Sequence, residues 1–247
     1  MSLDGVIVDG ASTDETVAIA QGWLDSLNLS KPWPVLVQSD NRGQATARNR
    51  GAQATQGQIL CFCDDDDVYR PHHFRLIYEG FQTVLPLAAP FLVDTPSDRP
   101  ATVTTGIYFG DPIHPEWKQA LEGTMIQNRG IRRSLHNFIG GFPENDCFRS
   151  GTEDLAYVRW AENFGRRHHI PRETLEYHRY PDSHFDRQLK KFQRSPNLEH
   201  LANDLQRSPQ DLALNQARTE AYTRRHHHLV ASFQQQWLSR MDNARVD

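Results

Sequence analysis

Residues 59–67 read ILCFCDDDD, an apolar run that leads directly into four aspartates, Asp64–Asp67. The run has the length and the β-branched and aromatic content of a buried strand, so the aspartates stand where that strand ends. The same pattern occurs earlier in the chain, where Val6-Ile7-Val8 precedes Asp9. Acidic groups therefore follow two separate strands.

Helical segments separate these strands. Ser12 and Glu15 form a capping box, and the apolar residues that follow recur at helical spacing. A strand at 35–37 and a helix at 44–55 come before the run at 59–63. Such alternation predicts an α/β fold with a mostly parallel, Rossmann-like sheet and helices on both faces. Ligands of such sheets bind beyond the carboxyl ends of the strands, which is where the acidic groups fall.

The composition is that of a folded protein, and it argues against a disulfide framework. Of 247 residues, 38% are hydrophobic and 23% are charged, which is enough apolar material for a core. The net charge of −4 argues against a nucleic-acid partner. Three cysteines and no apolar run of membrane-spanning length favour a reducing compartment. We expect a cytoplasmic protein, with the inner membrane surface as the alternative location.

The C-terminal part differs from the rest in charge and pattern. Residues 1–165 carry 13 basic and 21 acidic side chains, whereas residues 166–247 carry 14 and 10. We expect a domain at 1–184 and a helical tail at 185–247. One face of the tail would carry an apolar stripe, formed by Leu229, Phe233, Trp237 and Met241. The stripe predicts packing on the domain or on a second subunit, with peripheral membrane contact as the alternative.

The four aspartates themselves indicate chemistry. Adjacent carboxylates repel one another unless a cation lies among them, and hard cations prefer carboxylate oxygens. Asp64 and Asp66, two residues apart, can converge on one metal ion from a turn after a strand. The alternative is a solvated acidic turn. The position of the aspartates at the end of a strand favours the metal site over this alternative.

Five segments resemble glycosyltransferase family 2, in the order and at the spacing of that family. They are Val6–Asp14 (VIVDGASTD), Asn41–Gly43 with Ala47–Gly51 (NRG and ARNRG), Cys63–Asp67 followed by Pro71, Gly140–Glu144 (GGFPE) and Gly151–Asp154 (GTED). The resemblance covers about residues 5–165. It implies a GT-A fold and inverting transfer of a sugar from a nucleotide-diphosphate donor, in glycan or polysaccharide biosynthesis.

The resemblance also assigns roles. Asp64 and Asp66 would be the D-x-D pair that meets Mg²⁺ or Mn²⁺, and Asp154 would be the catalytic base with Glu153 beside it. The residues facing the nucleotide would be Asp9, Asp14, Arg48 and Asp65. Without the resemblance, Glu153 and Asp154 read as acidic residues that complement a helix dipole. Arg48 has a helical position that points toward the nucleotide edge, with a solvated surface residue as an equal alternative. A UDP-sugar donor is favoured, with a glycan, a lipid-linked molecule or a small molecule as acceptor.

Two departures from the family pattern favour an alternative function. Family members begin with a further strand ending near P-x-Y-N, whereas here the sequence opens at the strand that follows. Gly10 and Ala11 also leave a single carboxylate where the commoner D-D-G-S form has two. A non-catalytic nucleotide- or sugar-binding remnant of the fold is therefore the alternative. No Q-x-x-R-W element occurs, which disfavours a processive polymer synthase.

Overall fold

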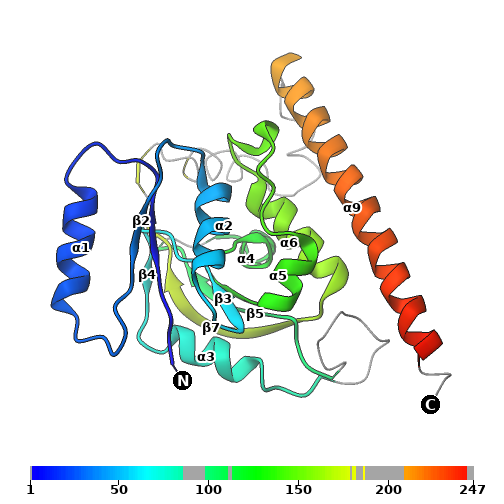
Figure 1. Cartoon of the computed structure of the whole chain (residues 1–247), viewed down its shortest axis with the longest axis horizontal. Coiled ribbons are helices and arrows are strands. Elements are labelled where there is room, and N and C mark those ends of the chain that lie inside the picture. The colour runs from blue at the N-terminus through cyan, green and yellow to red at the C-terminus, as the bar shows by residue number, and fades with distance from the viewer. Residues whose placement is uncertain are drawn as a thin grey trace.

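A computed structural model describes residues 2–85, 98–110, 113–178, 180–181, 186 and 209–243 (Figure 1). The elements in chain order are β1 (Ile7–Asp9), α1 (Thr16–Ser26), β2 (Val35–Val37), α2 (Gln44–Ala54), β3 (Ile59–Cys61), β4 (Val68–Tyr69), α3 (His73–Gly80), β5 (Thr102–Tyr108), α4 (Pro115–Thr124), β6 (Arg129–Arg132), α5 (Arg133–Ile139), the 3₁₀ turn η1 (Asp146–Phe148), α6 (Glu153–Phe164), β7 (Arg167–Glu176) and α9 (Pro209–Asn243). The helix predicted at 44–55 is confirmed to within a residue.

The strands form two sheets. β1 pairs in parallel with β2, and the other five strands follow the order β3-β6-β5-β7-β4. In this larger sheet β3–β6, β5–β6 and β4–β7 are antiparallel, and β5–β7 is parallel. The α/β class is confirmed, but the larger sheet is mixed where a mostly parallel sheet was expected. The reason is that β6 lies beside both β3 and β5 and runs opposite to each.

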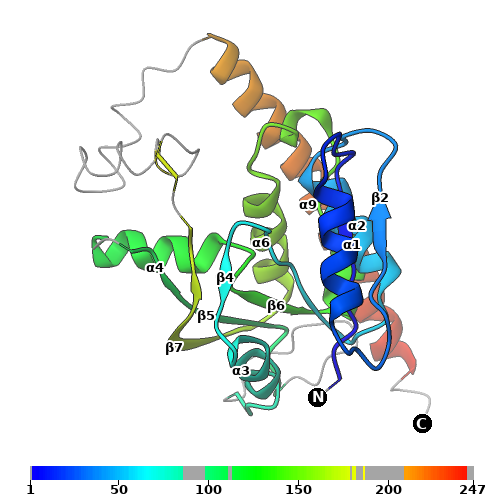
Figure 2. The same ribbon diagram turned by 90° about the vertical axis from the view of Figure 1, so that its left-hand side faces the viewer.

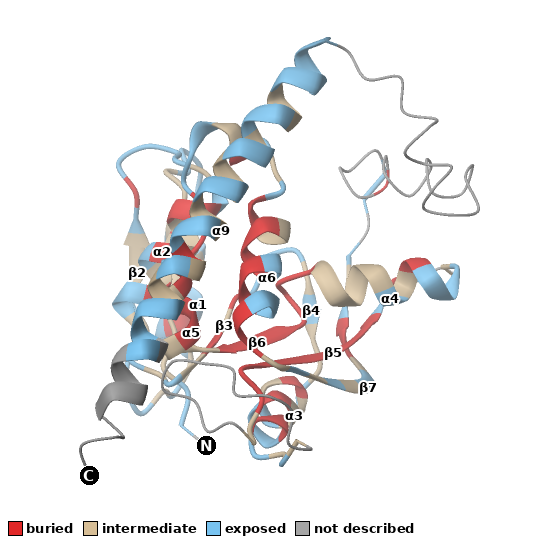
Figure 3. Ribbon diagram, turned by 90° about the vertical axis from the view of Figure 1, so that its right-hand side faces the viewer, coloured by how far each residue is buried: buried red, intermediate tan, exposed pale blue. Residues whose placement is uncertain are grey.

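Helices cover both faces of the larger sheet, as predicted. Figures 1 and 2 show α3 on one face and α4, α5 and α6 on the other. The buried positions of α6 include Tyr157, Trp160, Ala161 and Phe164, which recur every three or four residues and form one apolar stripe. Burial is concentrated on β5, β6 and this stripe (Figure 3). The hydrophobic core therefore includes α6, the helix that begins with Glu153.

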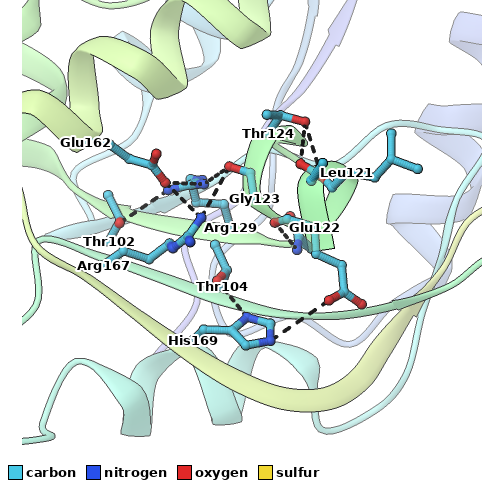
Figure 4. Close-up of polar contacts among 12 residues, drawn as sticks. Thr102, Thr104, Leu121, Glu122, Gly123, Thr124, Arg129, Glu162, Arg167 and His169 are labelled. Atoms are coloured by element: carbon cyan, nitrogen blue, oxygen red, sulfur yellow. Dashed lines mark hydrogen bonds and ion pairs between the residues drawn. The ribbon is translucent and has the colours of Figure 1, made fainter. Parts of the chain in front are cut away.

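A buried arginine ties α4, α6 and the larger sheet together (Figure 4). The side chain of Arg129 is fully buried and donates hydrogen bonds to the Gly123 carbonyl, Thr102 Oγ1 and Glu162. Burial lowers the pKa of Arg129 to about 10, and the nearby carboxylate of Glu162 opposes that shift. Arg167 donates to the same carboxylate from β7. One buried cation thus connects α4, β5 and α6, and Arg167 of β7 shares its carboxylate partner.

The C-terminal helix α9 lies against α5 and α6 (Figure 1). Leu229 is 4% exposed within the main core, and Phe233 packs against Phe138 and Phe164. The predicted stripe is thus confirmed for Leu229 and Phe233, whereas the side chains of Trp237 and Met241 lie outside the described residues. Within the described ranges, every helix is too short or too polar to cross a bilayer.

Two leucines of α9 allow a matched test of this packing. Leu229→Ala should lower the free energy of unfolding by about 2 to 4 kcal/mol, because it leaves a cavity in the core. For a protein of this size, that corresponds to a fall in the melting temperature of roughly 5 to 15 °C. Leu238→Ala, at a side chain that is 62% exposed, is the control and should leave the melting temperature nearly unchanged. Equal effects in calorimetry would contradict the packing of α9 on α6.

Candidate active site

The predicted acidic segments lie around one cavity of about 2100 Å³. β1 and β3 both border it, as do the start of α2 and the aspartates at 64–67. Glu153 and Asp154 line it from the first turn of α6. The ends of β1 and β3 thus open onto a common space, as the expectation from the sequence required.

Asp64 is held by two neighbouring side chains. Arg48 Nη2 lies 2.9 Å from Asp64 Oδ1 and 3.2 Å from Oδ2, and Gln127 Nε2 donates to Oδ2 at 2.6 Å. No sequence pattern marks Gln127, because it stands alone in the loop between α4 and β6 and only the tertiary fold brings it to the cavity. These bonds fix the orientation of Asp64 toward the rest of the aspartate run.

The aspartate run supplies a candidate metal site. One oxygen each of Asp64, Asp66 and Asp67 lie within 4.8 Å of one another. Asp67 Oδ1 accepts a hydrogen bond from the His178 N–H, whereas Oδ2 is buried with no hydrogen-bond partner among the described residues. A buried carboxylate oxygen without a partner, beside two further carboxylates, fits an oxygen-liganded divalent cation.

The electrostatics of Asp67 support the same fit. Burial, together with the neighbouring carboxylates Asp66, Asp64 and Asp65, raises the pKa of Asp67 to about 7. A cation would relieve both effects, because it favours the ionised form. Sequence reasoning named Asp64 and Asp66 and missed Asp67, although it belongs to the same run. Asp65 is exposed, lines the cavity and is not part of the cluster.

Arg48 connects the aspartate run to the start of α6. Its Nη1 donates to Glu153 at 3.1 Å while its Nη2 binds Asp64, and the guanidinium lies 5.4 Å from the centre of the Phe142 ring. The side chain is 9% exposed, so the alternative of a solvated surface arginine is wrong. Arg48 therefore forms ion pairs with two carboxylates from different elements inside the cavity wall.

Glu153 and Asp154 begin α6 and sit where burial opposes ionisation. Burial raises the pKa of Asp154, with the charge of Asp64 adding to the effect and Arg48 opposing it. Burial and the charge of Asp154 likewise raise the pKa of Glu153. A carboxylate with a raised pKa is a stronger base at neutral pH, and such perturbed groups cluster at functional sites. Here the helix-dipole interpretation and the catalytic one are compatible.

Asp9 borders the cavity, but both of its carboxylate oxygens accept hydrogen bonds within its own turn. Its Oδ1 accepts hydrogen bonds from the Ala11 and Ser12 N–H groups, and its Oδ2 accepts one from the Ser12 hydroxyl at 2.6 Å. These bonds lower the pKa of Asp9. The predicted capping box is wrong, because Ser12 bonds to Asp9 and α1 begins only at Thr16. Asp14 bonds to Thr16 and does not line the cavity.

A polar clamp joins α2 to the loop after α5. Asn49 accepts a hydrogen bond from the Phe142 N–H and donates to the Phe142 carbonyl and to Glu144. Thr46 donates to the same Glu144 carboxylate. Sequence reasoning assigned no role to Asn49, although it stands in the quoted ARNRG segment. The clamp sets the position of the loop that leads toward α6.

The clamp leaves no room for a side chain at Gly141. Gly141 has φ +71°, and a Cβ there would lie 2.4 Å from Asn49 Oδ1. Gly141→Ala should therefore destabilise the fold by more than the about 1 to 2 kcal/mol of the left-handed backbone alone. Gly110→Ala is the control, because Gly110 has φ +79° with open space around it. Equal losses of unfolding free energy in the two variants would show that the close approach to Asn49 is unimportant.

Comparisons with known proteins agree with this architecture. Three solved structures share the fold at 15% to 18% sequence identity. The S. aureus TarS 1–349 structure has a TM-score of 0.52 and covers 70% of this chain and 50% of that chain. Its complex with UDP-GlcNAc gives a TM-score of 0.54, covering 90% and 63%. The mannosyltransferase PcManGT of Pyrobaculum calidifontis, in complex with GDP-Man and Mn²⁺, gives 0.53, covering 93% and 64%.

The sequence comparisons identify the family. An uncharacterized glycosyltransferase of Nostoc sp. is 39% identical over 79 residues, which is 32% of this chain and 23% of that protein. The chain thus spans less than two thirds of the length of each of these relatives. The family model for "Glycosyl transferase family 2" matches residues 2–140, which include β1, α2 and the whole aspartate run. With a family match over more than half its length and the fold of solved glycosyltransferases, the chain belongs to glycosyl transferase family 2.

Proposed function

We propose that this protein transfers a sugar from a nucleoside-diphosphate donor to an acceptor hydroxyl, with inversion at the anomeric carbon and dependence on a divalent metal ion. One observation carries the proposal: a single cavity is bordered both by a carboxylate cluster suited to a metal-bound diphosphate and by buried carboxylates suited to proton transfer. Membership of family 2 supports the same reaction class.

The metal site would comprise Asp64, Asp66 and Asp67, whose oxygens suit Mg²⁺ and Mn²⁺ equally. When bound, the ion supplies positive charge beside the diphosphate leaving group. The protein's own part is to hold the ligands: Arg48 and Gln127 fix Asp64, and the His178 N–H fixes one oxygen of Asp67. Preorganised ligands of this kind need no rearrangement when the donor enters.

Asp154 is proposed as the base. It would accept the proton of the acceptor hydroxyl while that oxygen attacks the anomeric carbon and the nucleoside diphosphate leaves from the opposite face. Attack opposite to the leaving group inverts the configuration at that carbon. The raised pKa of Asp154 strengthens it as a base at neutral pH. Glu153, paired with Arg48, would hold the first turn of α6 toward the aspartates.

The donor is proposed to be a nucleotide sugar, with UDP-sugars first. TarS structures contain UDP or UDP-GlcNAc, and PcManGT contains GDP-Man and Mn²⁺. Asp9, Arg48 and Asp65 line the cavity and remain proposed contacts of the nucleotide. Asp14 also remains a proposed contact, although it does not line the cavity. We propose a role in glycan or polysaccharide biosynthesis at the cytoplasmic side, with a glycan, lipid-linked or small-molecule acceptor.

A second candidate is nucleotide-sugar binding without turnover. The observation that favours it is that both oxygens of Asp64 already accept hydrogen bonds from Arg48 and Gln127. An aspartate held in this way is less available to the metal ion that would stabilise the leaving group, so a donor could bind in the cavity without being turned over. This candidate predicts tight donor binding with no release of nucleoside diphosphate.

One assay separates the two candidates. The protein is incubated with a panel of UDP- and GDP-sugars and Mn²⁺, with and without simple acceptors, and released nucleoside diphosphate is measured. Release that stops when the metal is chelated supports the transferase. Donor binding by calorimetry without release supports the second candidate. Neither binding nor release across the panel would contradict both.

A further inference from the structure

The C-terminal helix α9 is bonded to the segment that leads into α6. Arg225 Nη2 donates to the carbonyls of Ile139 and Gly141, the second at 3.0 Å. Its guanidinium stacks on Trp160 of α6, 4.4 Å from the ring centre. About two turns earlier on the same helix, Arg218 donates to the Cys147 carbonyl at 2.8 Å. Among the described residues, both arginines thus donate to backbone carbonyls of this segment rather than to carboxylates.

Arg218 also donates to Ser150 Oγ at 2.9 Å, directly before the corner that starts α6. Gly151 has φ +114° and Thr152 has φ +71°. The left-handed region is unfavourable for a β-branched residue such as threonine, and such a conformation persists only where the surroundings hold it. The Thr152 carbonyl accepts the Ala156 N–H and so begins the helix that carries Asp154.

The same segment is held from its other side by α2. Asn49 and Thr46 bond to Phe142 and Glu144, and α2 lines the cavity. The segment 139–152 is therefore hydrogen-bonded both to α2 and to α9.

We infer that Arg218 and Arg225 are positioning residues, which hold the segment 139–152 so that Glu153 and Asp154 face the cavity. The inference rests on the proposed function, since it concerns the placement of the proposed base. Arg225 acts at the end of α5, where a cation also stabilises the last helical carbonyls. Arg218 acts at the strained corner of α6. The planar fork of Arg218 bonds to the Cys147 carbonyl through Nε and to Ser150 Oγ through Nη2 at once, which lysine does not reproduce.

The test compares three substitutions on one helix. Arg218→Met and Arg225→Met remove the bonds while keeping apolar length, and Arg224→Met is the control because Arg224 is exposed. Hydrogen–deuterium exchange of residues 140–156 should accelerate at least about tenfold in the first two variants and stay unchanged in the control. In the transfer assay, kcat should fall by about tenfold to hundredfold, with the donor KM nearly unchanged. Arg218→Lys should restore only part of kcat.

The outcomes separate the inference from the proposed function. Unchanged exchange at 140–156 in both variants would overturn the inference, whatever the activity. Faster exchange with unchanged kcat in an active protein would also overturn it, because the segment would then be held without consequence for the base. Faster exchange at 140–156 in a protein that transfers no sugar would support the holding role of the two arginines and contradict only the proposed function. A uniform rise in exchange over the whole chain would indicate unfolding and count against a positioning role.

Discussion

Asp154→Asn is expected to lower kcat for sugar transfer by about 10²- to 10⁴-fold, because an amide cannot accept the proton of the acceptor hydroxyl. Binding of the donor should change little, since the proposed base contacts the acceptor. The assay is nucleoside diphosphate release at saturating donor, with calorimetry for donor affinity. Asp25→Asn, on the exposed outer helix α1, is the matched control and should retain full activity.

The same substitution should stabilise the fold at neutral pH. Burial raises the pKa of Asp154, so the folded protein binds this proton more tightly than the unfolded chain does. The free energy of unfolding therefore falls as the pH rises from the ordinary aspartate range through the raised pKa, and an asparagine avoids that loss. Melting temperatures of wild type and Asp154→Asn should converge at acid pH and separate at neutral pH. A less stable variant at neutral pH would contradict this account of the site.

Catalysis by an ionised Asp154 has the opposite pH dependence. Because the base must be deprotonated, kcat should fall as the pH falls through the raised pKa. Activity is thus expected to disappear at a higher pH than an ordinary aspartate would allow. A pH profile of kcat at saturating donor measures this limb. A profile that stays flat down to the range of a solvated aspartate would exclude Asp154 as the base.

Asp67→Ala and Asp66→Ala are expected to weaken Mn²⁺ binding at least about 100-fold, measured in the presence of a nucleoside diphosphate. Each removes one of the three convergent oxygens. Asp65→Ala is the control, because it removes a charge from the same run but no oxygen of the cluster. Titration calorimetry of the three variants against wild type gives the comparison. Equal affinities in wild type and Asp67→Ala would remove Asp67 from the site.

Metal binding should also become tighter with rising pH. The pKa of Asp67 is about 7, so part of this carboxyl is protonated at neutral pH and must lose its proton to the solvent when a cation binds. The apparent affinity for Mn²⁺ is therefore expected to rise between about pH 6 and pH 8. This dependence should vanish in Asp67→Ala. Its persistence in that variant would mean that another group titrates.

The first third of the chain was predictable because its patterns are local. The alternation of apolar strands with α1 and α2 places Asp9 and the aspartate run at one edge, and the structure has them around one cavity. The pairing of β6 could not be read in the same way. β6 joins β3 and β5 across long sequence separations, and periodicity does not state the direction in which a strand returns.

The candidate site likewise has a part that local sequence patterns predict and a part that only the tertiary fold creates. Asp64, Glu153 and Arg48 stand in recognisable segments, but the bonds among them depend on tertiary packing. Gln127 shows the limit most clearly, because a single glutamine in a loop has no pattern that marks it. Asp9 shows another limit of the sequence. An aspartate at a turn can accept hydrogen bonds from the N–H groups of the residues that follow it, and only the structure shows that Asp9 does so.

The central claim is that this cavity carries out inverting sugar transfer, and proton NMR of the donor's anomeric centre tests it most directly. With Mn²⁺, an accepted nucleotide sugar and an acceptor, the donor's anomeric signal should decay. A product signal of the opposite anomeric configuration should appear at the same rate, and both changes should be absent with Asp154→Asn. A product with retained configuration, or full turnover by Asp154→Asn, would contradict the account.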